Sequence, residues 1–311
     1  MKESKQCYIG VDGGGTKTAL GIYDHSGQCL ASTVCPSLNY HVIGVDAALR
    51  HLRQGIETLC ESGAEIAAVG IGDPAIDDVS ESASALQFAS AVREMLGVPV
   101  YIRSDAYMTL YGLTRGECPG VLVISGTGAM AMAENAERKL FVAGGWGRLT
   151  GDEGSGYFIG LEGIRAALHA ADDISPATSL TDAVLTHFRC KSPREMIDVF
   201  YGETEPDVAG FARIVGDCAE VGDRAAIEIL HRAARYLADY VSVLIEKSQA
   251  DTVGVYGSVL CKNRIVRAEF EHLLRERYAQ IRIEEPPISA QAAAAMYAQD
   301  QNEKRINHES K

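Results

Sequence analysis

The stretch from Tyr8 to Leu20, which reads YIGVDGGGTKTAL, constrains the fold of this chain more than any other. A short apolar run ends at Asp12, a glycine-rich turn follows, and a second apolar run begins at Ala19. Two apolar runs around a glycine turn are typical of a β-hairpin. Glycines have no Cβ, so their backbone N–H groups can lie against an anion. The sequence therefore predicts a hairpin whose turn either binds an anion or simply reverses the chain.

Spacing excludes two other anion-binding motifs. A Walker loop places its lysine directly after the second glycine, whereas Thr16 separates Gly15 from Lys17 here. A Rossmann fingerprint requires a helix after its glycines, and a second strand is expected instead. Asp12 ends the first strand with a carboxylate that suits a hydrated Mg²⁺. Lys17 is either a phosphate contact or a solvated lysine of the turn.

The same layout returns in the middle of the chain. Residues 120–124 are expected to form a strand, Ser125-Gly126-Thr127-Gly128 a turn, and 129–133 a second strand. A further turn leads into a strand at 139–143. This order repeats that of residues 8–34 and predicts an internal duplication of a β-hairpin-led α/β unit, with a boundary near residues 116–119.

A third turn of glycine and hydroxyl, Gly257-Ser258, follows a strand expected at 252–256. Because ligands of α/β folds bind outside the carboxyl ends of strands, we expect the three turns to serve one phosphorylated ligand. One helix is expected to start at Asp46 as its N-cap. Further helices are expected at 82–96, 106–113, 156–170, 178–188, 193–200, 207–221, 224–248, 261–278 and 290–298, and a frayed polar tail at 300–311.

Length and composition bound the class of protein. A chain of 311 residues is comfortable for two domains. A net charge of −13 argues against general binding of nucleic acid or acidic membrane surfaces. No signal peptide is recognised, and no run approaches the roughly 20 apolar residues of a membrane span. Eight scattered cysteines without a CxxC pair favour reduced thiols over disulfides or a zinc site, so a cytoplasmic location is expected.

On these motifs the chain resembles the BadF/BadG/BcrA/BcrD ATPase family of the actin/Hsp70/sugar-kinase superfamily, and within it the N-acetylglucosamine kinase branch. The most specific segment is GGWGRLTGDEGSGY at residues 144–157. The resemblance covers about residues 7–298. It implies an α/β, two-lobed actin-like ATPase (ribonuclease H-like) fold. The expected parts are an N-terminal lobe (1–116, joined by helix 290–300), a C-terminal lobe with a helical insertion (117–289) and a polar tail (301–311).

The resemblance also implies an activity. The chain would transfer phosphate from ATP, with Mg²⁺, to a hydroxyl of an amino sugar, most simply N-acetylglucosamine to its 6-phosphate, and would form a homodimer. Asp105 would be the general base and Asp12 the metal ligand. The implied nucleotide contacts are Gly14, Gly15, Thr16, Lys17, Gly126, Thr127, Gly257 and Ser258. The implied sugar contacts are Asn39, Asp105, Gly145, Trp146, Gly147 and Asp152.

Simpler structural roles stay open for several of these residues. Asp105 suits the N-cap of the helix that follows it. Asn39 suits a left-handed turn, and Trp146 suits core packing. Asp152 and Glu153 suit the start of the next helix, where its dipole favours a carboxylate.

Competing functions also remain. N-acetylmuramic acid and glucosamine are alternative acceptors. Ala129-Met130 stands where sugar-binding relatives usually carry small polar residues, so either a hydrogen bond to the substrate is lost there or a different N-acyl or lactyl group is preferred. An activator ATPase of the BadF type would need cysteines for an iron–sulfur cluster, and none lies between residues 118 and 190. A sugar-responsive regulator would need an N-terminal DNA-binding segment, but the first strand is expected by residue 8. A kinase acting on a small-molecule amino sugar, with no nucleic acid or membrane partner, is therefore the favoured interpretation.

Overall fold

A computed structural model describes residues 6–14, 17–60, 65–74, 76, 78, 83–117 and 119–309. The chain forms two compact units, which are described separately. The first comprises Met1–Cys118, Arg138–Leu140 and Pro286–Lys311, and the second comprises Pro119–Glu137 and Phe141–Glu285.

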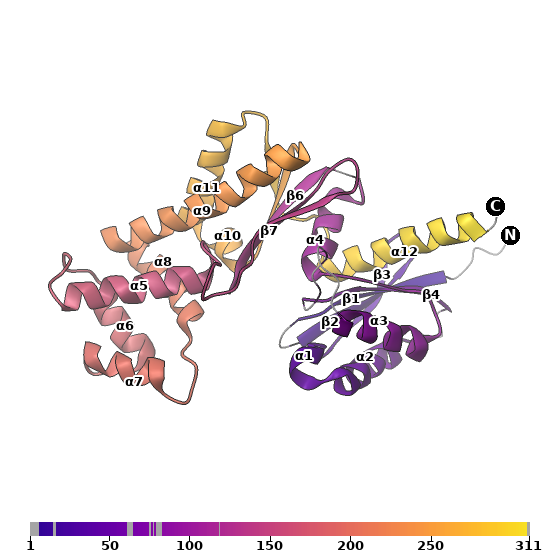
Figure 1. Ribbon diagram of the computed structural model, residues 1–311, viewed down its shortest axis with the longest axis horizontal. Coiled ribbons are helices and arrows are strands. Elements are labelled where there is room, and N and C mark those ends of the chain that lie inside the picture. The colour runs from indigo at the N-terminus through magenta and orange to yellow at the C-terminus, as the bar shows by residue number, and fades with distance from the viewer. Residues whose placement is uncertain are drawn as a thin grey trace. The chain divides into compact units, whose positions relative to one another are not determined.

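The first unit is built on a mixed sheet (Figure 1). Its strands are β1 (Gln6–Asp12), β2 (Lys17–Asp24), β3 (Cys29–Pro36), β4 (Glu65–Gly72) and β5 (Val100–Arg103). Their order is β3-β2-β1-β4-β5, with β1 antiparallel to β2 and parallel to β4, and with β4 parallel to β5. Asp12 lies opposite Gly72, which lies opposite Arg103, so the three parallel strands end at one edge.

Helices pack on both faces of this sheet. They are α1 (Tyr40–Ile43), α2 (Val45–Cys60), α3 (Ala83–Leu96), α4 (Asp105–Thr114) and α12 (Ala290–Glu309). Ile9 and Val11 are buried in a core shared with α2 and α3, while the alternate residue Tyr8 packs against α12. Glycine is required at Gly10 on the α12 face, because a Cβ there would lie 1.8 Å from the Gln291 carbonyl oxygen.

The second unit has a sheet with the same plan. Its strands are β6 (Gly120–Ser125), β7 (Ala129–Glu134), β8 (Leu140–Gly144), β9 (Thr252–Tyr256) and β10 (Arg282–Glu284). The order β8-β7-β6-β9-β10 repeats that of the first sheet, and β6 is likewise antiparallel to β7 and parallel to β9, with β9 parallel to β10. The predicted duplication and the α/β fold class are confirmed.

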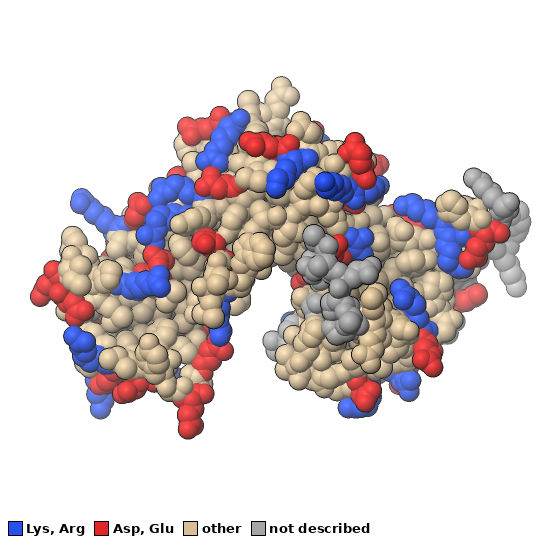
Figure 2. Space-filling view, in the orientation of Figure 1, with Lys and Arg blue, Asp and Glu red and all other residues tan. Residues whose placement is uncertain are grey.

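Helices form most of the second unit, and α9 and α11 lie side by side (Figure 1). The elements are α5 (Gly156–Ala171), α6 (Leu180–Phe188), a 3₁₀ turn η1 (Pro193–Glu195), α7 (Met196–Tyr201), α8 (Val208–Glu220), α9 (Arg224–Ser248), α10 (Ser258–Lys262) and α11 (Arg264–Arg277). The core joins the inner face of the sheet to α5, α8, α9 and α11. On the visible face of this unit, acidic and basic side chains are interspersed (Figure 2).

Three element predictions were wrong in detail. The helix predicted from Asp46 begins at Val45, so Asp46 lies in its first turn and is not its cap. The helix predicted at 261–278 is two helices, because Asn263 leaves the helical conformation and its side chain accepts a hydrogen bond from Val266 N at 3.0 Å. The predicted frayed tail is helical to Glu309, because Asn302 is buried and accepts a hydrogen bond from Arg305.

Among the described residues, none of the helices combines the length and apolar character needed to cross a bilayer.

Candidate functional site

Three carboxylates follow the ends of the parallel strands in the first unit. Asp12 ends β1, Asp73 follows β4, and Asp105 begins α4 after β5. The backbone is close-packed here, since Gly13 N donates to Gly72 O at 2.8 Å, and a Cβ on Gly72 would lie 3.3 Å from Asp105 Cα. The parallel arrangement therefore gathers acids that are far apart in sequence at one edge of one sheet.

The charge of Asp105 affects the ionisation of Asp12. Burial and, to a smaller extent, the negative charge of Asp105 together raise the pKa of Asp12 to about 6. A pair of carboxylates that resists simultaneous ionisation is stabilised when a divalent cation supplies the missing positive charge. The site therefore fits the predicted role of Asp12 as a Mg²⁺ ligand. Within the described residues, no cluster of three or more His, Cys, Asp or Glu side chains is arranged to hold a metal.

Asp105 is not the cap of α4. Ser104 occupies the N-cap position, and its Oγ accepts a hydrogen bond from Tyr107 N at 2.9 Å. The Asp105 carboxylate accepts one hydrogen bond at Oδ1, from Ala106 N at 2.7 Å. Burial raises the pKa of Asp105, although the backbone hydrogen bond from Ala106 opposes this shift. Because Ser104 does the capping, the carboxylate remains available as a proton acceptor.

Asn39 is joined to the same edge through the loop after β3. Ser37 Oγ donates to Gly14 O at 2.8 Å and accepts from Asn39 N at 3.1 Å. Asn39 has φ −66°, so the left-handed turn alternative is wrong. Its Oδ1 is buried and finds no hydrogen-bond partner among the described residues. A buried acceptor of this kind is suited to a ligand hydroxyl.

The sequence interpretation missed two residues beside this loop. The Tyr40 hydroxyl is buried without a partner among the described residues. Burial and, to a smaller extent, the charge of Asp73 together raise the pKa of Tyr40 to about 12. Asp73 is itself buried. The sequence signal that could have identified Asp73 was its position directly after β4, which resembles the positions of Asp12 and Asp105 at the ends of their strands.

Two of the nucleotide residues predicted in the first hairpin, Gly15 and Thr16, lie outside the described residues. Gly14 is tied to Ser37, as noted above. Lys17 is exposed at the start of β2. The role of Lys17 therefore stays a prediction.

In the second unit, the turn between β6 and β7 lies against the turn after β9. Gly257 has φ +94°, and a Cβ on it would lie 2.4 Å from Ser125 O. Glycine is needed at this position for both reasons. The N-terminus of α5 joins the same cluster, because Gly156 N donates to Gly126 O at 2.7 Å and Tyr157 N donates to Thr127 O at 3.1 Å. Two of the three predicted phosphate turns are thus brought together.

A cavity of about 530 Å³ opens beside these turns. Its lining includes Gly126, Thr127 and Ser258 from the predicted motifs, and a Cβ on Gly126 would meet no atom within 4 Å. The volume lies in the range of small-molecule sites. The opposite walls come from α8 and the α10–α11 junction, including Arg213, Lys262 and Asn263. No motif marked these helical residues, because they are adjacent to the turns only in the folded unit.

These features fit a nucleotide. A glycine turn with open space above it and neighbouring hydroxyls offers backbone and side-chain donors to phosphate oxygens. Thr127 and Ser258 are the hydroxyls, and Gly126 leaves open space beside its backbone. The rest of the cavity is large enough for the remaining part of a ligand.

The glycine-rich segment at residues 144–157 also belongs to the second unit. Gly145 and Gly147 both have positive φ. Trp146 between them is 77% exposed, so the core-packing alternative is wrong. Its indole is available to cover an apolar face of a ligand.

Asp152 lies next to the β6–β7 turn. It has φ +59°, and a Cβ on Gly128 would lie 2.9 Å from Asp152 Oδ2. Neither Asp152 nor Glu153 caps α5, because Ser155 does so through a hydrogen bond from Phe158 N at 3.0 Å. Glu153 instead accepts a hydrogen bond from the Tyr240 hydroxyl.

The comparison with known proteins identifies the family. Residues 9–298 match the model of the BadF/BadG/BcrA/BcrD ATPase family. The chain is 34% identical over 261 residues to the N-acetyl-D-glucosamine kinase of Dictyostelium discoideum, covering 80% of this chain and 82% of that protein. It is 29% identical to the N-acetylmuramic acid/N-acetylglucosamine kinase of Clostridium acetobutylicum, covering 88% of this chain and 92% of that protein.

Solved structures identify the fold. A Chromobacterium violaceum protein, provisionally assigned as an N-acetylglucosamine kinase, aligns with TM-score 0.71 and 24% identity over 94% of this chain and 99% of its own. A glucokinase from Streptomyces griseus, solved with glucose and AMPPNP, aligns with TM-score 0.59 and 19% identity over the same shares. The predicted actin-like fold is confirmed, and the chain belongs to the BadF/BadG/BcrA/BcrD ATPase family.

Proposed function

We propose that this protein is an ATP-dependent kinase that phosphorylates a hydroxyl of an amino sugar, most simply the 6-hydroxyl of N-acetylglucosamine. The observation that carries the proposal is Asp105, a buried carboxylate that does not cap α4, because Ser104 does, and whose charge raises the pKa of Asp12. A kinase for a neutral hydroxyl needs such a carboxylate to orient the acceptor and take its proton. The Dictyostelium and Clostridium relatives are named for this substrate.

The proposed roles follow from the chemistry of each side chain. Asp105 accepts the proton of the attacking hydroxyl. Asn39 Oδ1, which is buried and unpaired among the described residues, accepts a hydrogen bond from another sugar hydroxyl. Asp152, Gly145, Trp146 and Gly147 remain proposed sugar contacts. A Mg²⁺ ion held by Asp12 would neutralise phosphate charge.

The nucleotide is assigned to the second unit. Gly126, Thr127, Gly257 and Ser258 would hold its phosphates beside the cavity, and α8 would bound its other end. Gly14, Gly15, Thr16 and Lys17 are proposed as further phosphate contacts from the first hairpin. ATP supplies the transferred phosphoryl group, and the chain's residues align it with the acceptor.

The alternative acceptors are N-acetylmuramic acid and glucosamine. The Clostridium relative is named for the first as well as for N-acetylglucosamine, and a Vibrio cholerae relative with 28% identity is named a glucosamine kinase. Met130 bears on this choice, since its Cβ lies 3.2 Å from where a Cβ on Gly145 would be. An apolar side chain beside a proposed sugar contact favours a substrate with an N-acyl group over a free amine.

A family ATPase that needs no sugar is the remaining alternative. None of the cysteines whose side chains are described forms a disulfide; these are Cys7, Cys29, Cys35, Cys190, Cys218 and Cys261. We further propose a homodimer and a cytoplasmic location.

The test is ADP release from Mg-ATP with glucose, glucosamine, N-acetylglucosamine, N-acetylmannosamine and N-acetylmuramic acid, each compared with a sugar-free reaction. We expect turnover that depends on N-acetylglucosamine and yields its 6-phosphate. Preference for another amino sugar would move the proposal to an alternative acceptor. ADP release that no sugar changes would overturn the kinase and favour the ATPase.

A further inference from the structure

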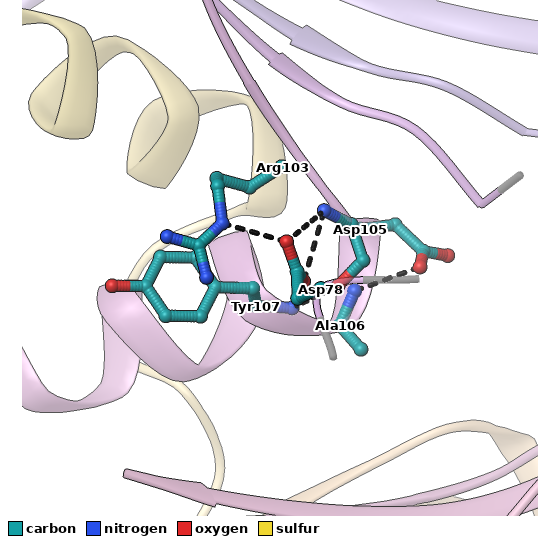
Figure 3. Close-up of polar contacts among 6 residues, drawn as sticks. Asp78, Arg103, Asp105, Ala106 and Tyr107 are labelled. Atoms are coloured by element: carbon teal, nitrogen blue, oxygen red, sulfur yellow. Dashed lines mark hydrogen bonds and ion pairs between the residues drawn. The ribbon is translucent and has the colours of Figure 1, made fainter. Parts of the chain in front are cut away.

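An ion pair lies behind the first turn of α4. The Asp78 carboxylate accepts a hydrogen bond from Arg103 Nε at 2.6 Å and from Ser104 N at 3.1 Å (Figure 3). The Asp78 side chain is 1% exposed and that of Arg103 is 28% exposed. We call Asp78 and Arg103 the clamp. It holds the last residue of β5 and the N-cap of α4 at the same time.

The clamp is braced on its other side by aromatic rings. The Arg103 guanidinium carbon lies 3.7 Å from the centroid of the Tyr107 ring, and Figure 3 shows the two groups side by side. Tyr107 packs edge-on against Tyr297 of α12, with ring centroids 5.7 Å apart. Arg103 thus cannot change direction without losing both its carboxylate partner and its stacking partner.

Asp105 lies between the two anchored points. Ser104 before it is held by Asp78, and Tyr107 after it donates its backbone N–H to Ser104 Oγ. Its carboxyl group points away from Asp78 and Arg103 (Figure 3). The contacts of Asp78 with Arg103 and Ser104 therefore fix the backbone from which the Asp105 carboxylate points in the opposite direction.

Net stability is a poor explanation for such a pair. Burying two charges costs desolvation energy that their attraction seldom exceeds, and an apolar pair of the same shape is often as stable. What a charged pair with directional hydrogen bonds adds is a fixed orientation of the groups that it holds. Here the held group is the backbone that carries Asp105.

We propose that Asp78 is a positioning residue for Asp105 and acts through Arg103 and the backbone of Ser104. The inference rests on the proposed role of Asp105 as the base. Displacing a reacting group by about 1 Å can cost on the order of a hundredfold in rate. Removing the Asp78 charge should therefore lower turnover, although the Asp78 side chain is only 1% exposed.

The first readout does not depend on activity. Hydrogen exchange of the backbone amides at residues 104–108, followed by mass spectrometry, should be faster in Asp78→Asn than in the wild type. The matched control is Asp24→Asn, which removes another carboxylate that accepts backbone hydrogen bonds, from Ser26 N and Gln28 N, at the other end of the first hairpin. The control should leave exchange at 104–108 unchanged. Unchanged exchange in Asp78→Asn as well would overturn the clamp.

The second readout is a double-mutant cycle. Asp78→Asn should lower kcat by about 10- to 100-fold with KM for ATP and sugar changed by less than about threefold. In an Asp105→Asn background the same change should lower the residual rate by less than about twofold, because the group being positioned is gone. An equal loss in both backgrounds would show that Asp78 serves general structure.

Arg103→Lys covers the case in which Asp78→Asn does not fold. It keeps a cation beside Asp78 but loses the planar group that stacks on Tyr107, so we expect the same pattern at smaller size. If the wild type shows no sugar-dependent turnover, the proposed function fails, while the exchange measurement still decides whether the clamp exists.

Discussion

The two sheets share one strand order but present different chemistry at the edge where their parallel strands end. The edge of β1, β4 and β5 carries Asp12, Asp73 and Asp105. The equivalent edge of β6 and β9 carries hydroxyls and glycines from Ser125 to Gly128 and at Gly257-Ser258. Duplication therefore preserved the backbone plan, while the residues just beyond the strands set what each unit can bind.

The electrostatic consequence is opposite in the two units. Carboxylates accept protons, cations and hydroxyl hydrogens, so the first edge suits a metal, a base and a polyol. Exposed backbone N–H groups and hydroxyls suit phosphate, so the second edge suits a nucleotide. The same strand order can therefore suit the sugar that accepts the phosphoryl group in one unit and the nucleotide that donates it in the other.

The largest effect should come from removing the proposed base. Asp105→Asn keeps the size of the side chain but cannot accept a proton, so we expect kcat to fall by about 10²- to 10⁴-fold. Nucleotide affinity, measured by calorimetry with a non-hydrolysable ATP analogue, should stay within about twofold of wild type. A large loss of nucleotide affinity would break the division of labour between the two edges.

Equivalent substitutions in the central strands β1 and β6 should also destabilise the two units by different amounts. In Gly10→Ala the new Cβ would overlap the Gln291 carbonyl oxygen at 1.8 Å, so α12 must move. We expect a loss of about 3 kcal/mol in the free energy of unfolding, measured by urea denaturation. Val123 takes the equivalent place in β6, two residues before the strand end, and is fully buried. Val123→Ala should cost less, about 1–2 kcal/mol, because it leaves a small cavity and forces nothing apart.

The nucleotide assignment can be sharpened without disturbing the fold. A Cβ on Gly126 would meet no atom within 4 Å, so Gly126→Ala should leave the melting temperature unchanged. It would place a methyl group in the cavity that Gly126 lines, and we expect ATP affinity to fall about tenfold by calorimetry. Wild-type affinity in this variant would argue against nucleotide phosphates at this turn.

The smallest effect concerns the dependence of stability on pH in metal-free buffer. The pKa of Asp12 is raised to about 6 by burial and by Asp105, so ionising it costs stability as pH rises from about 4 to 6. Asp12→Asn should therefore stabilise the protein above pH 6, on the order of 1 kcal/mol.

Asp223 in the second unit provides the opposite case. Burial would raise its pKa, but hydrogen bonds from Ala226 N, Thr178 and Ser179 lower it below the ordinary value. Its stabilisation is present above the unfolded pKa near 3.8 and is lost as pH falls through the lower folded value. Asp223→Asn should destabilise the protein by about 1 kcal/mol at neutral pH, because Asn can still cap the helix but loses the charged oxygen that accepts hydrogen bonds from Thr178 and Ser179. Melting temperatures of both variants and of the wild type, measured from pH 3 to 8, test these trends. If the melting temperatures of the two variants changed with pH in the same way relative to wild type, both predictions would be contradicted.

Local sequence was sufficient for the strands, the turns and the duplication. Apolar runs broken by glycine turns specify hairpins through backbone conformation, which needs no distant partner. Local sequence did not predict where α12 ends. Its polar C-terminal segment is held in the helix by tertiary contacts such as those that bury Asn302.

The sequence by itself placed Asp12, Gly126 and Gly257 at strand ends and in glycine turns, and the resemblance to the family predicted Asp105 as the base. Only the tertiary structure decided what surrounds them. Ser104, and not Asp105, is the N-cap of α4, and α8 forms one wall of the cavity. Asp78 accepts a hydrogen bond from Arg103, which lies 25 residues further along the chain. Such contacts depend on how sheet and helices pack, and the spacing of residues along the chain contains no signal for them.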